Sequence, residues 1–182
     1  RRVHLWSVKH ARPKLSLEGA SNDITCIKFN KSTNMVIAGT VSGTILSWDL
    51  LEAQKFSKLG GHLTEVRFIE PGNCEEDQHL LLTGSGDSNV KLWDLKAKKC
   101  LKTFKGHTKP VNCGKLSPDG NWVVSGSDDG DIIIWDIKSE TIVQTIGNPG
   151  QKVISLILNP CTFTMATGFA NKVVKYWDLE SF

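Results

Sequence analysis

The sequence predicts an all-β fold, a β-propeller built from repeated four-stranded blades. A Trp-Asp pair recurs with its tryptophan at positions 48, 93, 135 and 177, at spacings of 45, 42 and 42 residues. Before each pair, two short apolar runs flank a tight turn, as in a β-hairpin. No apolar stretch keeps a helical period for more than a turn or two. A fixed period of this length, filled with short strands, is typical of a radial array of blades.

The strands and turns follow the same order in each repeat. Gly61-His62 and Gly106-His107 open two of the repeats, and a proline-glycine turn at 117–120 separates the first two strands of the second of these. The fourth strand is expected to be outermost. In the repeat that begins at Gly106, the predicted strands are 111–116, 122–126, 132–136 and 141–146.

The predicted blades are about 19–60, 61–105, 106–146 and 147–182, after a partial blade at 1–18. Rings of such repeats hold six to eight blades, which needs roughly 250–350 residues at this period. We therefore expect the chain to cover about four blades of a longer, six- to eight-bladed ring. The blade from Gly61 carries an acidic segment at 72–78 and is expected to have a short or irregular first strand.

The composition predicts a cytoplasmic domain without a cofactor. Apolar residues make up 40% of the chain and charged residues 23%, and no apolar run approaches the 18 residues of a membrane span. An odd number of widely spaced cysteines without a Cys-x-x-Cys pair predicts reduced thiols and no zinc site. These cysteines are Cys26, Cys74, Cys100, Cys113 and Cys161.

The charge is unevenly distributed. Residues 91–115 hold eight lysines and one aspartate, whereas residues 65–77 hold five acidic residues and one arginine. Lysines on an outer strand can prevent edge-to-edge pairing. Alternatively, they form a basic patch for an acidic partner such as a tubulin tail or nucleic acid. Nucleic acid is the weaker choice because no aromatic residues alternate with the lysines for base stacking.

Two repeats contain a histidine, a hydroxyl residue, an aspartate and a tryptophan at matching positions. The two sets are His62, Thr83, Asp87 and Trp93, and His107, Ser125, Asp129 and Trp135. Histidine, hydroxyl and carboxylate also make up a hydrolase triad. A structural hydrogen-bonded tetrad explains the repetition better, because one active site does not need two copies. We therefore expect no catalytic residues and no enzyme activity.

The other two full repeats lack this tetrad. Ala20 and Ser42 occupy the histidine and aspartate positions in the first, and Asn148 and Asn171 occupy them in the last. These blades are expected to be less rigid, because a buried hydrogen-bond network is incomplete in them.

These motifs are those of WD-repeat propellers, and the whole chain resembles the propeller of the regulatory, non-ATPase subunit of katanin, the microtubule-severing enzyme. The resemblance is carried by RRVHLWSV (1–8), VSGTILSWDLLEAQK (41–55) and KYWDLESF (175–182). It implies a propeller that targets and regulates severing. It also implies partners in tubulin and, through regions outside this chain, in the katanin ATPase subunit. The implied location is the cytoskeleton, the centrosome or the base of the cilium.

A non-catalytic scaffold is the favoured function. The alternatives are a WD-repeat subunit of another assembly, such as a ubiquitin-ligase adaptor or a ciliary complex, and more remotely a propeller-fold enzyme. Partners are expected to bind the face formed by the loops between blades and the turns between second and third strands. The candidate binding residues are Asn22, Asp23, Glu65, Lys109, Asp128, Gln151, Lys152 and Phe169. Phe169 could anchor a partner there or pack against the neighbouring blade.

Overall fold

The computed structural model describes residues 2–10, 12–51, 56–72, 78–159, 162 and 164–179. In these ranges all regular elements are β-strands, and no helix is present. The strands form antiparallel sheets whose order follows the chain. The predicted all-β propeller fold is therefore confirmed.

The first sheet pairs β1 (Val3–Ser7) with β2 (Arg12–Leu17). The next contains β3 (Ile24–Asn30), β4 (Met35–Thr40), β5 (Thr44–Asp49) and β6 (Phe56–Gly60). It is followed by β7 (Val66–Pro71), β8 (Leu80–Ser85), β9 (Asn89–Asp94) and β10 (Lys99–Lys105). The fourth contains β11 (Val111–Leu116), β12 (Trp122–Ser127), β13 (Asp131–Asp136) and β14 (Ile142–Gly147). The last contains β15 (Val153–Leu158), β16 (Thr164–Phe169) and β17 (Val174–Asp178).

The expectation of a short or irregular first strand after Gly61 is wrong about its length, although the pairing of the strand is irregular. Strand β7 has six residues, the same length as β11, and it pairs with β8 over Val66 to Pro71. The first pairing is interrupted between Val66 and Phe68, as it is between Val111 and Cys113 in the next sheet. The chain therefore fits the same bulged strand into the stretch from Gly61 to Pro71, which is shorter than the corresponding stretch from Gly106 to Pro118. Most of the acidic segment, residues 73–77, lies outside the described residues.

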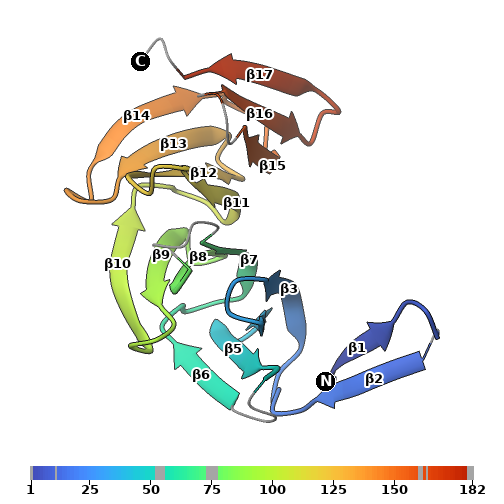
Figure 1. Ribbon diagram of the computed structural model, residues 1–182. Helices are drawn as coiled ribbons and strands as arrows, with labels where there is room; N and C mark the ends of the chain where they lie inside the picture. The colour runs from blue at the N-terminus through green and yellow to red at the C-terminus, as the bar shows by residue number, and fades with distance from the viewer. Residues whose placement is uncertain are drawn as a thin grey trace.

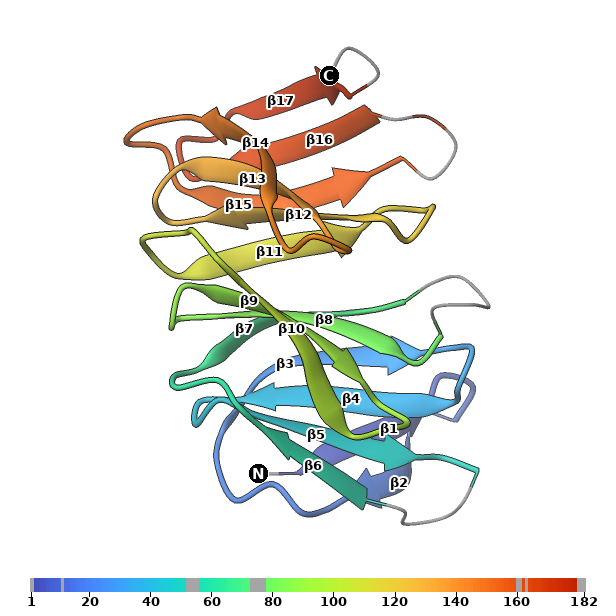
Figure 2. The ribbon, with the colours of Figure 1, turned by 90° about the vertical axis from the view of Figure 1, so that its left-hand side faces the viewer.

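The sheets follow one another along an arc, as Figure 1 shows. The first strands of the larger sheets, β3, β7, β11 and β15, lie on the inner side of the arc, and β6, β10 and β14 lie on its outer side. Figure 2 shows the same sheets stacked from the N-terminal to the C-terminal end. This radial arrangement brings the turns of successive sheets to common faces of the molecule.

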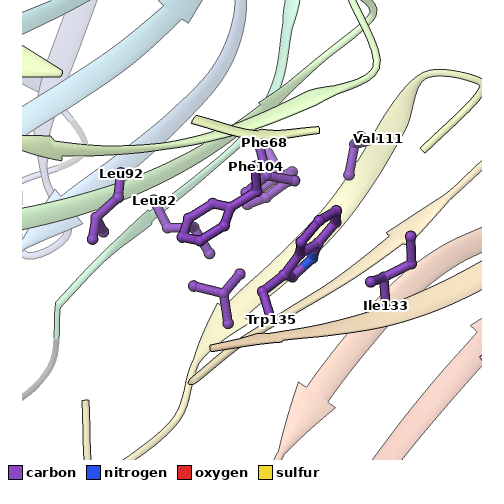
Figure 3. Close-up of a cluster of buried hydrophobic side chains, with 9 residues drawn as sticks. Phe68, Leu82, Leu92, Phe104, Val111, Ile133 and Trp135 are labelled. Carbon is purple, nitrogen blue, oxygen red and sulfur yellow. The ribbon is translucent and has the colours of Figure 1, made fainter. Parts of the chain in front are cut away.

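The hydrophobic core is divided among the spaces between neighbouring sheets. In the cluster of Figure 3, Leu82, Leu92 and Phe104 from one sheet meet Ile133 and Trp135 from the next. The Phe104 and Trp135 rings are tilted, with centroids 5.6 Å apart. Three further clusters fill the other spaces between sheets. The sheets are thus held together mainly by burial of apolar side chains between them.

Candidate partner-binding surface

A chain of hydrogen bonds links the four tetrad residues of the β7–β10 sheet. The Trp93 Nε1–H group donates to Thr83 Oγ1 over 2.8 Å, and Thr83 Oγ1 lies 2.8 Å from His62 Nε2. His62 Nδ1 lies 2.9 Å from Asp87 Oδ2. Since the aspartate can only accept, His62 donates from Nδ1 and accepts the Thr83 hydroxyl proton at Nε2.

The next sheet repeats this network with serine in place of threonine. Trp135 Nε1–H donates to Ser125 Oγ over 2.8 Å, and Ser125 Oγ lies 2.8 Å from His107 Nε2. His107 Nδ1 is 3.1 Å from Asp129 Oδ2, which also accepts the backbone N–H of Thr108. Each network therefore ties a loop between sheets to the middle of a blade.

Neither network is placed to act as a hydrolase triad. Thr83 and Ser125 are fully buried, and each hydroxyl oxygen already accepts an indole N–H bond. Burial lowers the pKa of both His62 and His107, so each imidazole is held neutral within the blade. The nucleophile position is closed to substrate, and the hydrogen-bonding capacity is used internally.

In the β3–β6 and β15–β17 sheets, other hydrogen bonds take the place of the tetrad. Trp48 Nε1–H donates to the backbone carbonyl of Glu18 over 2.7 Å, because no hydroxyl faces it. In the last sheet Trp177 Nε1–H still donates to Thr167 Oγ1, but Asn148 occupies the histidine position. The Asn148 Oδ1 atom accepts from Lys175, whereas its buried Nδ2 has no hydrogen-bond partner.

Loops between sheets and turns between second and third strands meet at one face of the molecule. Backbone hydrogen bonds join each pair, and they run from Val41 to Asp23, from Gly86 to Glu65, from Asp128 to Pro110 and from Ala170 to Lys152. The same bond thus occurs in four successive sheets. We call this face the loop face.

Three of the predicted binding residues are brought together on the loop face by two residues that the sequence did not single out. Glu65 pairs with Arg67 over 3.1 Å, and Arg67 reaches across to Asp128 over 3.3 Å in the next sheet. Lys152, from the following loop, lies 3.4 Å from the same Asp128 carboxylate. Asn112 accepts from Arg67 over 2.8 Å and donates to Asp128 over 2.9 Å. We call these five residues the loop-face network.

The loop-face network combines fixed and accessible charges. Burial alone would raise the pKa of Asp128, but the Asn112 amide and the Lys152 and Arg67 cations lower it, so its carboxylate is ionised. The Asp128 side chain is only 14% exposed, whereas Arg67 is 32% and Lys152 57% exposed. Partly buried charges whose partners already orient them lose little freedom on binding. The network can therefore present cationic and anionic groups in a defined arrangement.

The other predicted residues lie on the same loops but outside this network. Asn22 donates to Ser42 Oγ over 2.9 Å, and the Asp23 and Lys109 carbonyls accept local hydrogen bonds. Gln151 is half-buried, and its Oε1 atom has no hydrogen-bond partner. Their role in binding stays a prediction.

Phe169 is not a surface anchor. Its side chain is 5% exposed and belongs to the core cluster that contains Val153 and Leu156. The Lys175 ammonium lies 5.2 Å from the centre of its ring. Phe169 instead packs in the core. It is the last residue of β16, and its ring fills the space beside the inner strand β15.

A second polar cluster lies on the inner wall of the arc. Glu70 on β7 is buried and pairs with Lys115 on β11 and, over 3.7 Å, with Lys28 on β3. Together with Ile154 and Ile157, these residues line a hollow of about 350 Å³. The three charges stand at matching positions of three inner strands, so the cluster ties successive blades together.

Two kinds of site were not found in the described part of the chain. No group of three histidine, cysteine, aspartate or glutamate side chains is placed to hold a metal ion. The described residues also form no helix that is long and apolar enough to cross a membrane.

Comparison with known proteins identifies the repeats. A family model described as WD domain, G-beta repeat matches residues 11–49, 54–94 and 98–136, which is more than half of the chain.

Similar proteins include subunits of large assemblies. Coatomer subunit beta'-1 of Arabidopsis thaliana is 32% identical over 56% of this chain and 11% of that protein. Eukaryotic translation initiation factor 3 subunit I of Aspergillus terreus is 30% identical over 60% of the chain and 31% of that protein. The human angio-associated migratory cell protein is 28% identical over 65% of the chain and 26% of that protein. The chain thus spans less than a third of the length of these relatives.

Proposed function

The chain belongs to the WD domain, G-beta repeat family, and from that premise we propose that it is a non-catalytic scaffold that docks other proteins on its loop face. The observation that carries this proposal is the loop-face network, which joins side chains from three successive blades. The rigid tetrads beneath it hold these loops in place through Asp87 and Asp129. Two relatives named as subunits of larger assemblies support a role within a complex.

In its sharper form, we propose that this scaffold is the targeting and regulatory propeller of a katanin-like severing complex. The support is the resemblance of the strings at 1–8, 41–55 and 175–182 to the katanin regulatory subunit. Tubulin would then be a partner, and the protein would act in the cytoplasm at the cytoskeleton, the centrosome or the base of the cilium. A scaffold subunit of another assembly is the alternative, in line with the coatomer and initiation-factor relatives.

Affinity capture with quantitative mass spectrometry tests both forms. The chain would be compared with a double variant, Asp128→Lys with Lys152→Glu, which reverses two charges of the network and keeps the net charge. A matched control, Lys14→Glu with Glu18→Lys, reverses two exposed charges at the first sheet, away from the network. We expect partners to be lost at least tenfold from the loop-face variant and kept by the control.

The identity of the lost partners separates the two forms. Loss of tubulin together with the katanin ATPase subunit would support the katanin form, and loss of the subunits of a different assembly would support the alternative. If no partner depended on Asp128 and Lys152, the loop-face proposal would be wrong.

A further inference from the structure

Among the outer strands of the four-stranded sheets, β10 is the richest in lysine. Strand β10 and the turn before it carry exposed lysines at positions 96, 98, 99 and 105. The outer strand of the next sheet, β14, has no lysine, and β6 has one. At about 3.3 Å per residue, the seven residues of β10 place Lys99 and Lys105 roughly 20 Å apart. We call these four lysines the β10 strip.

The lysines of the β10 strip have no acidic partners among the described residues. The nearby Lys102 pairs with Glu140 over 3.0 Å, and Lys91 donates to Thr103 over 2.9 Å, so these two are engaged within the fold. The Asp94 carboxylate accepts the backbone N–H groups of Lys96 and Ala97. The strip therefore carries a net positive charge along the outer rim of one blade, with Asp94 as the acidic residue directly across from Lys99.

Protection of the sheet edge does not explain why the lysines gather here. Lysine on an outer strand does discourage pairing with another chain. Strand β14 is outermost in its own sheet, yet it has no charge and exposes Ile142 and Val143 at 45% and 52%. If edge protection set the charge of outer strands in this protein, β14 would need it more than β10.

We propose that the β10 strip is a docking site for an extended acidic polypeptide segment. Such a segment needs only about six residues to span the strip, and its carboxylates complement the free ammonium groups. A single-stranded nucleic acid would use aromatic stacking as well as charge. The aromatic side chains of β9 and β10, Trp93 and Phe104, are both buried at 1% exposure. This site deepens the proposed scaffold function, on which it rests, by adding a second surface away from the loop-face network.

Fluorescence anisotropy with a labelled ten-residue polyglutamate peptide tests the site. The chain would be compared with the triple variant Lys98→Gln, Lys99→Gln and Lys105→Gln. A control variant, Lys9→Gln, Lys14→Gln and Lys31→Gln, removes the same charge from exposed positions elsewhere. We expect the strip variant to bind about tenfold more weakly, equivalent to about 1.4 kcal/mol, and the control to bind like the original chain. Thermal melting would establish that both variants are folded.

Three results would overturn the site: no loss of binding in the strip variant, an equal loss in the control, or equally tight binding of a ten-nucleotide oligothymidylate through the same lysines. The Asp128→Lys, Lys152→Glu variant should keep peptide binding. Failure of the β10 strip is therefore distinguishable from failure of the loop-face proposal.

Discussion

At the scale of single residues, each tetrad connects a surface loop to the hydrophobic interior. Asp129 accepts the backbone N–H groups of Thr108 and Asp131 as well as the imidazole of His107. Burial alone would raise its pKa, but these hydrogen bonds together lower it, so the carboxylate stays ionised. One side chain thus fixes a turn and a loop, and orients a buried histidine.

Removal of this carboxylate should therefore destabilise the protein. We expect Asp129→Ala to lower the free energy of unfolding by about 1–3 kcal/mol, because it leaves buried donors without an acceptor. His107→Ala should have a similar effect. Ser42→Ala should cost much less, because Ser42 is exposed and its blade has no histidine to orient. Chemical denaturation measures all three, and equal losses would show that the tetrad has no special role.

The buried histidines also make stability depend on pH. Their pKa values are lowered from 6.5 in the folded protein, mainly by burial, so the unfolded chain takes up protons at higher pH than the folded chain does. The free energy of unfolding should therefore fall as the pH drops below about 6.5. The lowered pKa values of Asp87 and Asp129 act only near and below pH 3.8, outside this window.

Urea denaturation at pH 7.5 and pH 5.5 checks this dependence. We expect lower stability at pH 5.5, and a smaller difference between the two pH values in His107→Gln, which cannot take up the proton. A stability that did not change between the two values would mean that the imidazoles are protonated as readily in the fold as in the unfolded chain.

At the scale of blades, the close approach of a second strand to the inner strand of the next sheet limits which residue the second strand can carry at that point. A Cβ atom on Gly126 of β12 would lie 2.5 Å from Val153 Cγ1 on the next inner strand. The matching Gly168 of β16 has its nearest such neighbour, Ser155 Cβ, at 3.9 Å. Glycine is thus required where one blade packs on the next, and not at the same position in the last sheet.

This difference predicts opposite outcomes for one substitution in two blades. Gly126→Ala should destabilise the protein by about 1–3 kcal/mol, since the packed Val153 side chain must shift to admit the methyl group. Gly168→Ala should be tolerated with little change. Thermal melting of the two variants provides the comparison, and a similar melting temperature for both would contradict the packing between β12 and β15.

Repetition also explains which features the sequence could predict. The strands and the four tetrad positions recur at fixed offsets, so His62 and His107 could be recognised together. Arg67 and Glu70 could not, because the matching positions on β11 are Asn112 and Lys115, and their interactions depend on contacts between blades. An alignment of the repeats finds these positions, but only the structure shows that their charges meet. For Phe169 the sequence leaves a surface anchor and packing against the next blade open, and only the structure shows that this residue ends β16 with its ring buried.

At the scale of the whole molecule, one broad face of the last sheet is left uncovered. The register of β15, β16 and β17 places Ile157, Ala166 and Tyr176 in one row across this face, with Val174 in the next row. Ile157 is 61%, Tyr176 71% and Val174 74% exposed. In the β7–β10 sheet, the residues of the corresponding row include Leu82 and Leu92. Both are buried against the next blade.

An apolar sheet face of this kind favours association. We expect the 182-residue chain to self-associate at micromolar concentration, and the double variant Val174→Lys with Tyr176→Lys to remain monomeric at the same concentration. The substituted residues are exposed, so the variant should keep the stability of the original chain. Sedimentation velocity over a range of concentrations measures this. A chain that stayed monomeric throughout would show that the apolar row is too small to bind a second copy, while association unchanged by the two lysines would place the contact on another surface, such as the exposed Ile142 and Val143 of β14.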